Sequence, residues 1–362
     1  MKIAFRADAS LRMGSGHVMR CVTLANALKQ KGAECHFLCR EHPGHLLELV
    51  RGKGHVVHVL PCEPDSPIDR NGPAHAAWLG ATQEQDAQAC LPILQALQPD
   101  WLIVDHYALD IRWEESLRPF CRRLMVIDDL ADRAHQCDLL LDQNLGRKPA
   151  DYAGLVPEAC TGLVGPQYAL LRPEFAALRE TSLKRRDEPR LRSILISMGG
   201  VDGPNATSRV LDALRKCVLP DDCQLSVVMG PKAPWLQQVR DNAREMPWPT
   251  EVLVNVADMG ALMASSDLSI GAAGSTSWER CCLGVPSIIL VLAENQRFIS
   301  FELDKAGAAK AISLDEGNLE VQLKEVIDSY QIPVHLKETS IKAASVCDGA
   351  GVERVGRMLL GK

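Results

Sequence analysis

The N-terminal segment of the chain combines a short apolar strand, a glycine loop and an amphipathic helix, and this combination constrains the fold most. The strand is predicted at residues 2–6, and the loop with Gly14 and Gly16 opens a helix that ends near residues 31–32. Apolar side chains recur along this helix at the 3.6-residue period: Val18, Cys21, Val22, Ala25 and Leu28. A strand, a tight turn and a helix in this order predict one unit of a parallel α/β sheet.

The glycine loop predicts a helix end that binds an anion. The first turn of a helix leaves backbone N–H groups unpaired and carries partial positive charge, and Gly14 and Gly16 let a ligand approach the backbone closely. His17 follows at the mouth of this loop. Because histidine titrates near neutral pH, His17 is a candidate general base for hydrolysis or transfer at a sugar phosphate.

Two other phosphate-binding loops do not fit this segment. Met19 stands where the third glycine of a dinucleotide fingerprint would allow close helix packing, and no Gly-Lys-Ser/Thr follows as it does in a Walker loop. A purely structural interpretation stays open, in which the glycines satisfy a strand-to-helix turn and the histidine caps the helix.

Apolar runs and helical patterns alternate through the first half of the chain. Further strands are predicted at residues 34–39, 55–60, 101–105, 124–127 and 139–141. Continuous apolar runs of this length fit strands that are buried on both faces of a parallel sheet. Proline, glycine and charged residues interrupt the alternation between about residues 151 and 192. The basic stretch within this break, Lys184, Arg185 and Arg186 with Arg190 and Arg192, is predicted to be a solvated linker.

The pattern then restarts with a second strand, glycine loop and helix at residues 192–217. More strands are predicted at residues 225–229, 252–256, 268–270 and 287–292. A chain of 362 residues is long enough for two domains, so we expect an α/β protein with two Rossmann-like, doubly wound domains that face a cleft. The domains are predicted at residues 1–170 and 171–362, and the last helix could instead pack back on the first domain. Ligands of such domains bind outside the carboxyl ends of the strands, so the cleft is the expected site.

Composition narrows the class of protein. With 46% hydrophobic and 24% charged residues, the chain is expected to be a soluble globular protein. A formal net charge of -6 argues against a nucleic-acid partner, and no apolar run approaches the roughly 20 residues of a membrane helix. The 13 cysteines are scattered without a C-x-x-C pair, which favours reduced thiols and predicts a cytoplasmic location without a signal peptide.

A glycine loop in the second half also opens a helix after a strand. Gly274 and the hydroxyls of Ser275 and Thr276 are placed to bind phosphate there. Two interpretations of Glu279 stay open. It either forms a capping box with Thr276, or its carboxylate accepts hydrogen bonds from both hydroxyls of a ribose.

Two more segments complete the predicted nucleotide site. Gly199 and Gly200 precede a helix whose end, like the one at Ser275, is expected to hold diphosphate charge. Asn295 and Gln296 open another helix, and we expect their amides at the same cleft, with helix capping as the alternative.

Acidic and aromatic residues that follow two strands are further candidates. The segments 105–107 (Asp-His-Tyr) and 128–129 (Asp-Asp) lie where the chemistry of α/β proteins collects, or they simply end their strands as polar turn residues. No loop carries the paired carboxylates that hold a magnesium-bound diphosphate. We therefore expect no metal and no cofactor.

Taken together, these motifs resemble those of the nucleotide-sugar hydrolases of bacterial pseudaminic acid synthesis, the UDP-2,4-diacetamido-2,4,6-trideoxy-β-L-altropyranose hydrolases. Matching segments lie along nearly the whole chain, at residues 5–8, 14–20, 103–107, 127–129, 137–141, 168–172 and 198–200 and in the helices at Glu279 and Asn295-Gln296. The resemblance implies a fold similar to that of two-domain glycosyltransferases such as the peptidoglycan N-acetylglucosaminyltransferase. It also implies that His17 is the base and that Glu279 and Asn295 contact UDP. The chain departs from the family by long insertions, one of them at residues 61–85.

The predicted site residues form three groups. His17 is catalytic. The second group is predicted to bind the sugar of the substrate: Arg6, Gly14, Gly16, Arg20, Tyr107 and Arg172. The third group is predicted to bind UDP: Gly199, Gly200, Gly274, Ser275, Thr276, Glu279, Asn295 and Gln296.

The predicted reaction needs only one protein base. A sugar linked to a diphosphate already has a good leaving group, so the two opposed carboxylates of glycoside hydrolysis are not required. His17 would deprotonate a water that attacks the anomeric carbon opposite UDP, which predicts inversion. The alternatives are a UDP-sugar glycosyltransferase, in which an acceptor hydroxyl replaces the water, and a non-catalytic nucleotide-sugar sensor. The UDP-sugar is the only partner predicted, with no nucleic acid, membrane or obligate protein partner.

Overall fold

The structure is a computed structural model that describes residues 1–62, 69, 72–314 and 319–361. It divides into two units. Unit 1 consists of Met1–Leu170 together with Ala350–Lys362, and unit 2 consists of Leu171–Gly349. Each unit has its own sheet and its own core, and each is described by itself.

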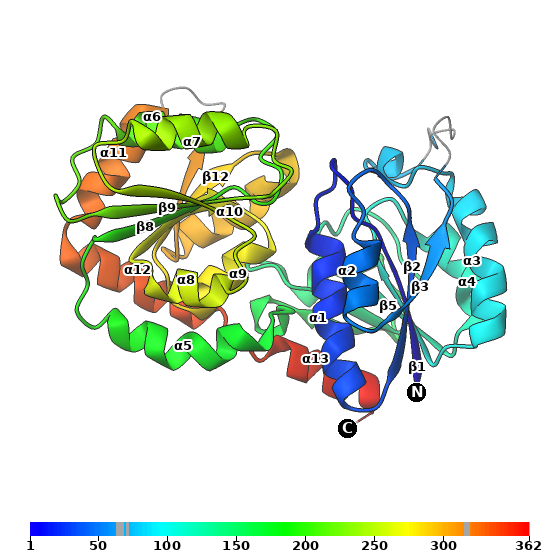
Figure 1. The fold of residues 1–362 in the computed structure, drawn as a ribbon. Coiled ribbons are helices and arrows are strands. Elements are labelled where there is room, and N and C mark those ends of the chain that lie inside the picture. Colours follow the sequence, from blue (N-terminus) through cyan, green and yellow to red (C-terminus); the bar gives the residue numbers. More distant parts are fainter. Residues whose placement is uncertain (63–68, 70–71, 315–318, 362) are drawn as a thin grey trace. The chain divides into compact units, whose positions relative to one another are not determined.

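Unit 1 is built on a seven-stranded parallel sheet with the strand order β3-β2-β1-β4-β5-β6-β7 (Figure 1). Its strands are β1 (Lys2–Ala7), β2 (Glu34–Arg40), β3 (Val56–Leu60), β4 (Trp101–Asp105), β5 (Arg123–Ile127), β6 (Leu139–Asp142) and β7 (Thr161–Val164). Its α-helices are α1 (Gly16–Gln30), α2 (Leu47–Gly52), α3 (Gln83–Leu97), α4 (Ile111–Leu117) and α13 (Gly351–Leu360). Short 3-10 helices are η1 (Ala76–Trp78), η2 (Arg118–Phe120), η3 (Pro149–Tyr152) and η4 (Pro166–Tyr168).

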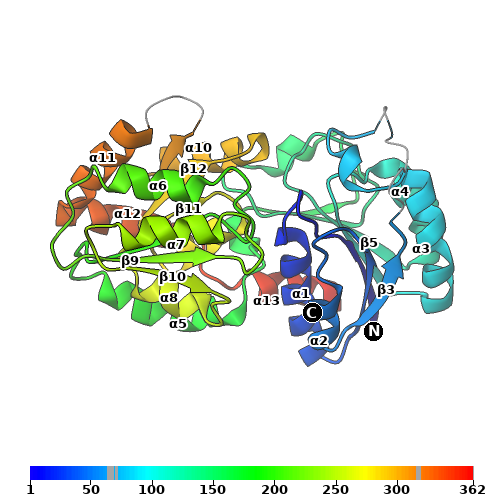
Figure 2. The same cartoon turned by 45° about the horizontal axis from the view of Figure 1, so that its top comes forward.

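Helices cover both faces of this sheet because successive side chains of a strand point to opposite faces. On β1, Ile3 and Phe5 join the core under α1, α2 and α13, whereas Ala4 joins the core under α3 and α4. Figures 1 and 2 show these two helical layers on opposite sides of the strands. The predicted apolar face of α1 is confirmed, since all five of its predicted residues are buried.

The last helix, α13, belongs to unit 1 and packs beside α1. Val355 and Leu359 lie in the same core as α1. Trp101 Nε1, on β4, donates to the Leu359 carbonyl at 3.0 Å. The chain therefore returns to unit 1 after it has completed unit 2.

Unit 2 contains a six-stranded parallel sheet with the order β10-β9-β8-β11-β12-β13. Its strands are β8 (Ser193–Ser197), β9 (Gln224–Met229), β10 (Thr250–Val254), β11 (Leu268–Ala272), β12 (Ser287–Val291) and β13 (Lys310–Ser313). Its helices are α5 (Pro173–Arg185), α6 (Ala206–Leu214), α7 (Leu236–Arg244), α8 (Met259–Ser265), α9 (Ser275–Cys282), η5 (Glu294–Gln296), α10 (Arg297–Lys305), α11 (Leu319–Tyr330) and α12 (Pro333–Val346). Helices α6, α7 and α11 lie on one face of the sheet, and α5, α8, α9 and α12 lie on the other (Figures 1 and 2).

The predicted fold class is confirmed: the chain forms two doubly wound α/β units with parallel sheets. The strands predicted from apolar runs lie within two residues of their observed ends, and β4 matches its predicted range in full. Strands β7 and β13 and helices α4, α5, α11 and α12 were not predicted.

The segment at residues 151–192, predicted as a break in the strand–helix alternation, has regular structure over much of its length. It contains β7, two 3-10 helices and the 13-residue helix α5. Arg186, expected in solvent, is buried and donates to the carbonyls of Ser182 and Ser266 at 2.7 and 2.8 Å. The polar composition of α5 concealed the helix, because only a narrow face of it is buried.

Candidate functional site

The N-terminus of α1 is open to a ligand. Gly14 has a φ of +78°, which favours glycine, whereas Gly16 has an ordinary φ and a side chain there would meet no atom within 4 Å. No side chain caps the helix at Ser15, and its first turn carries no acidic residue. The first N–H groups of the helix thus lack intrahelical acceptors beside open space, which suits an anion. A turn that only satisfied backbone geometry would explain Gly14 but not Gly16.

His17, in the first turn of α1, is oriented by a carboxylate. Its Nδ1 lies 2.6 Å from Oδ1 of Asp105, the last residue of β4, and both side chains are buried. Burial opposes ionisation of Asp105, but Arg20 and His17 outweigh this effect and hold the pKa of Asp105 far below its usual range. The ionised Asp105 accepts the Nδ1 proton, so the lone pair of the neutral ring is at Nε2, where a base would act.

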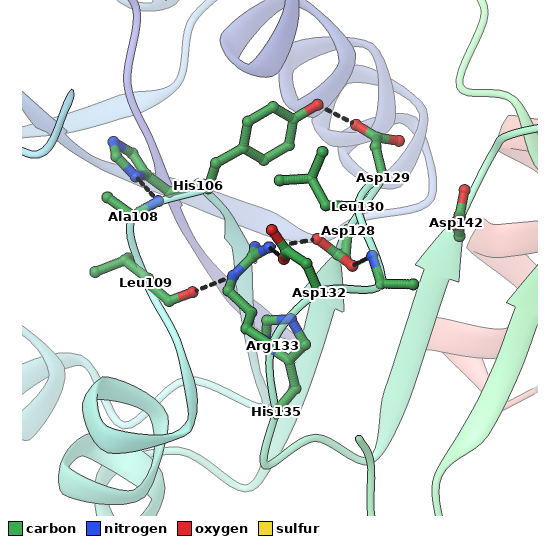
Figure 3. Close-up of polar contacts among 12 residues, drawn as sticks. His106, Ala108, Leu109, Asp128, Asp129, Leu130, Asp132, Arg133, His135 and Asp142 are labelled. Carbon is green, nitrogen blue, oxygen red and sulfur yellow. Dashed lines mark hydrogen bonds and ion pairs between the residues drawn. The ribbon is translucent and has the colours of Figure 1, made fainter. Parts of the chain in front are cut away.

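Arg20 connects this pair to a second carboxylate. Its Nε and Nη2 donate to the two oxygens of Asp105 at 2.6 and 2.7 Å, and its Nη1 lies 2.7 Å from Asp129 Oδ2. Tyr107 Oη donates to the same Asp129 oxygen at 2.8 Å, a contact drawn in Figure 3. The Tyr107 ring meets the His17 ring edge-on, with centroids 4.6 Å apart. His17, Asp105, Arg20, Asp129 and Tyr107 form one closed network, which we call the His17 network.

The structure brings three predicted residues of unit 1 together, namely His17, Arg20 and Tyr107. Asp105 and Asp129 had two open interpretations in the sequence, as strand-ending turn residues or as functional groups. Their contacts with His17 and Arg20 favour the second. The sequence signal was their position at the ends of parallel strands β4 and β5.

Arg6 does not belong to a ligand site, contrary to prediction. Its side chain is wholly buried, and its guanidinium pairs with Asp8 and Asp86, each at 2.7 Å. Asp86 lies on α3 and also accepts from Arg40 Nη2 at 2.6 Å. Arg6 therefore ties β1 to α3, because a buried guanidinium is stable only with ionised partners.

Aromatic side chains from the insertion at residues 61–85 extend the network. His75 directly precedes η1, and Trp78 is the last residue of η1. Their ring centroids lie 5.3 and 5.9 Å, respectively, from the ring centroid of Tyr107. Burial lowers the pKa of His75, so this ring is mostly neutral near pH 7. Sequence analysis named the insertion but not these residues, since their place depends on Tyr107, which is distant in the chain. Residues 63–68 and 70–71 of the insertion lie outside the described part of the chain.

Unit 2 presents a second open helix end, at α9. The helix begins after Gly274, which has a φ of +145°, and no side chain caps it. Ser275 is exposed and Thr276 is half-buried. Because Gly274 is the N-cap, Thr276 already lies inside the helix, so Thr276 and Glu279 do not occupy the N-cap and N3 positions of a capping box. The capping interpretation of Glu279 is therefore wrong.

Glu279, whose side chain is 17% exposed, is only weakly paired. Burial raises its pKa to about 7, and the nearby charges of Arg172 and Arg280 only partly offset this effect. Arg172 Nη2 lies 3.6 Å from Glu279 Oε1, while Arg172 Nη1 pairs with Glu174 at 2.9 Å. Arg172, predicted beside the sugar, thus lies in unit 2 beside Glu279 and not in the His17 network.

The helix after Gly199 and Gly200 differs from α9. Asp202 Oδ1 accepts from Ala206 N at 2.8 Å and Oδ2 accepts from Thr207 N at 2.9 Å, so a carboxylate already occupies the N-terminus of α6. The expectation that this helix end holds diphosphate charge is wrong. Gly199 and Gly200 themselves are exposed, and they stay predicted ligand contacts through their backbone only.

The two predicted amides near η5 differ in their contacts. Gln296 Oε1 accepts from Leu292 N at 2.9 Å, ahead of η5, and no side chain caps η5 or α10, so the capping alternative is not supported. Asn295 is exposed on η5. Both residues stay predicted amide contacts to a ligand.

The described residues include no metal cluster, and a cavity in unit 1 lies apart from the predicted site residues. In the described part of the chain, no group of three or more His, Cys, Asp or Glu side chains is arranged to hold a metal ion. A cavity of about 580 Å³ lies between α3 and α4, with Gln83, Leu91, Arg112 and Trp113 among its walls. No predicted site residue lines it.

The fold places the chain in a structural class, the glycosyltransferase-B fold. MurG of Acinetobacter baumannii matches with a TM-score of 0.73 and 14% identity, covering 100% of this chain and 99% of MurG. CalG4, the calicheamicin glycosyltransferase, matches with a TM-score of 0.64 and 13% identity, covering 100% of this chain and 98% of CalG4. Residues 194–349, within unit 2, match the glycosyltransferase family 28 C-terminal domain.

Three relatives are similar in sequence. An uncharacterized protein of Methanocaldococcus jannaschii is 25% identical over 82% of this chain, and the spore coat polysaccharide biosynthesis protein SpsG of Bacillus subtilis is 30% identical over 54% of it. The chain spans 57% of the length of each. The UDP-2,4-diacetamido-2,4,6-trideoxy-beta-L-altropyranose hydrolase of Campylobacter jejuni is 24% identical over 85% of this chain and 97% of its own length. No helix in the described ranges has the length and apolarity needed to cross a membrane.

Proposed function

We propose that the protein hydrolyses a UDP-linked 2,4-diacetamido-2,4,6-trideoxy sugar at its anomeric carbon, with inversion, and releases UDP and the free sugar. The observation that carries the proposal is the orientation of His17 by Asp105, at a hydrogen-bond distance of 2.6 Å. It leaves Nε2 of a histidine in the first turn of an uncapped helix free to accept a proton. The similarity to the Campylobacter jejuni hydrolase over nearly its whole length supports the same reaction.

In this reaction, water attacks the anomeric carbon on the face opposite UDP and gives its proton to His17 Nε2. The bond from the anomeric carbon to the diphosphate oxygen breaks, and its electron pair leaves with UDP. Asp105 stabilises the imidazolium that forms. Unit 2 contributes the nucleotide contacts, with diphosphate at the N-terminus of α9 and ribose at Glu279. No step requires a metal ion, and the UDP-sugar is the only ligand.

A UDP-sugar glycosyltransferase is the second candidate, in which an acceptor hydroxyl takes the place of water. The match of residues 194–349 to a glycosyltransferase family domain favours this alternative. The His17 network would deprotonate the acceptor in the same way, so the network alone does not separate the two reactions.

Incubation with a panel of UDP-linked diacetamido-trideoxy sugars in ¹⁸O-labelled water tests the proposal. We expect UDP release without any acceptor, one labelled oxygen in the free sugar, and NMR signals of the inverted anomer first. UDP release only after addition of an acceptor would establish the glycosyltransferase instead. Nucleotide-sugar binding without turnover in either condition would indicate a sensor.

A further inference from the structure

Beneath the His17 network, one tyrosine hydroxyl lies between two buried carboxylates. Tyr152 Oη, at the end of η3, is 3.0 Å from Asp128 Oδ2 and 2.8 Å from Asp142 Oδ2. Both aspartates are wholly buried, and Tyr152 is 2% exposed. A hydroxyl has only one proton, so it can donate to one carboxylate and must accept from the other. This arrangement is stable only if one of the two aspartates carries a proton.

The contacts of the two aspartates identify the protonated one. Asp128 is paired with Arg133 Nη1 at 2.8 Å and accepts from Ala131 N at 2.8 Å, and these partners, with His135, hold its pKa below the usual value against the effect of burial. Asp142 accepts from Asn144 N at 2.8 Å, and the nearby cation Arg147 has its Nε 3.5 Å from Asp142 Oδ2. Burial, followed by the charges of Asp129 and Asp128, raises the pKa of Asp142 to about 7. The proton therefore resides on Asp142.

The segment after β6 also supports the segment after β5. Asn144 Nδ2 donates to the Asp129 carbonyl at 3.0 Å, and Arg147 Nη2 donates to the Leu130 carbonyl at 2.6 Å. Figure 3 shows Asp128, Asp129 and Asp142 at the ends of these neighbouring strands. Asp129 in turn holds Arg20 and Tyr107 of the His17 network.

We propose that Asp142 works in its protonated form as a positioning residue, donating to Tyr152 Oη while Tyr152 donates to Asp128, and so fixes Asp129 against Arg20 and Tyr107. Loss of the Asp142 proton places a second buried negative charge beside Asp128 and Asp129. Repulsion then loosens the segment that carries Asp129. The effect on turnover depends on the proposed function, whereas the effect on stability does not.

All charged groups that face Asp142 enter the balance. Asp128 and Asp129, after β5, favour its protonation, and Arg147 opposes it. Tyr152 stays protonated because burial and the two aspartates raise its pKa far above the usual range. Arg133 and His135 act on Asp128.

Thermal unfolding of Asp142→Asn against wild type tests the inference without any activity. The amide keeps the shape of the protonated acid, accepting from Asn144 N and donating to Tyr152 Oη. In wild type, the pKa of Asp142 is about 7 in the folded protein against a usual value of 3.8, so its contribution to stability is lost as pH rises across this window. We expect the Tm of the variant, relative to the Tm of wild type, to rise by about 2–4 °C or more between pH 4 and pH 7. Above pH 7 this difference in Tm should stay constant.

The matched control is Asp132→Asn. Asp132 lies in the segment after β5, which also carries Asp128 and Asp129, and it pairs with Arg133, but its side chain is 43% exposed. This variant also removes one negative charge. We expect the difference in Tm between Asp132→Asn and wild type to stay constant across the same pH range. A difference in Tm for Asp142→Asn that is independent of pH, or that shifts in favour of wild type as pH rises, would overturn the inference, because it would mean that Asp142 is ionised and paired with Arg147.

Turnover provides a second readout. We expect the kcat of wild type to fall above pH 7 and that of Asp142→Asn to hold, so that the variant is several-fold faster than wild type at pH 8.5. Should the variant not fold, ¹³C NMR of aspartate-labelled wild type decides the matter: one buried carboxyl must titrate near pH 7, and its absence refutes the inference. A protein that shows the stability effect but hydrolyses no UDP-sugar would contradict the proposed function and leave this inference standing.

Discussion

The two candidate sites differ in how completely their ionisable side chains are paired. In unit 1, every ionisable group of the His17 network has a partner, and the Asp105 carboxylate is held ionised by Arg20 and His17. In unit 2, Glu279 lies 3.6 Å from the Arg172 guanidinium, and burial raises its pKa to about 7. A network that is complete without ligand suits a group that must keep one geometry during a reaction. A carboxylate held only by a long ion pair, as Glu279 is, suits a group that obtains closer partners from the ligand.

Replacement of His17 tests the role of the His17 network and has the largest expected effect. For His17→Ala we expect the fold and the UDP affinity to persist and turnover to fall by roughly a hundredfold or more, the usual contribution of a general base. Steady-state kinetics and calorimetry with UDP measure the two quantities. Near-normal turnover would reduce His17 to a helix cap or a positioning residue.

The second test removes the partner of the base and not the base itself. Asp105→Asn can donate to His17 Nδ1 and so favours the wrong tautomer, which leaves the proton on Nε2. We expect turnover to fall by roughly 10- to 100-fold. Asp100→Asn is the matched control, since Asp100 precedes the other end of β4 and its carboxylate accepts from Lys2 N at an exposed position. Equal kinetics for the two variants would show that Asp105 does not orient the base.

The third test concerns the incomplete pairing in unit 2. Glu279→Gln replaces a double acceptor by one donor and one acceptor, so one ribose hydroxyl is left badly paired at a cost of about 1–3 kcal/mol. We expect the UDP affinity to fall by about fivefold to a hundredfold while the melting temperature barely changes. Glu174→Gln, which alters the other carboxylate beside Arg172, should keep the affinity. An unchanged affinity for Glu279→Gln would move the nucleotide away from α9.

The same group predicts a pH dependence of binding. Glu279 must be ionised to accept from both hydroxyls, and its pKa in the free protein is about 7. Wild-type UDP affinity should therefore rise with pH through about 7, and the rise should be absent in Glu279→Gln.

The fourth test contrasts the two helix starts of unit 2. Asp202 caps α6, whereas α9 has no side-chain cap. For Asp202→Ala we expect a stability loss of about 0.5–2 kcal/mol, the usual cost of removing an N-cap, with no loss of UDP affinity. Chemical denaturation and calorimetry measure both. Weaker UDP binding by this variant would mean that the Gly199-Gly200 loop holds the diphosphate after all.

The smallest expected effect is the response to chelation. Helix ends supply the positive charge for the diphosphate in our proposal, so turnover should survive EDTA. Loss of activity in EDTA that magnesium or manganese restores would contradict this and require a bound cation at α9.

The sequence predicted the sheets well and the roles of charged residues poorly, for physical reasons. Residues 101–105 form a continuous apolar run because β4 is buried on both faces, and such a run is visible locally. The role of Arg6 depends on Asp86, 80 positions away on α3, and no local pattern encodes that distance. In the same way, Tyr107 meets His75 and Trp78 only through the tertiary fold.

Helix ends were predictable in position but not in occupancy. The loops before α1, α6 and α9 all follow a strand and contain glycine, so sequence analysis treated them alike. What separates them is whether an acidic side chain folds back onto the helix N–H groups, as Asp202 does and as no residue does at α1 or α9. The Thr276–Glu279 spacing suggested a cap that the actual start of α9 rules out.

The place of α13 in unit 1 also has a consequence for synthesis of the chain on the ribosome. Unit 1 is complete only when Val355 and Leu359 reach their core beside α1, and these residues follow the whole of unit 2, Leu171–Gly349. At roughly 5–20 residues per second, the intervening chain takes on the order of 10–35 s to translate. During that interval the nascent first unit exposes the apolar strip that α13 later covers, so this interval is when the protein most needs protection from aggregation.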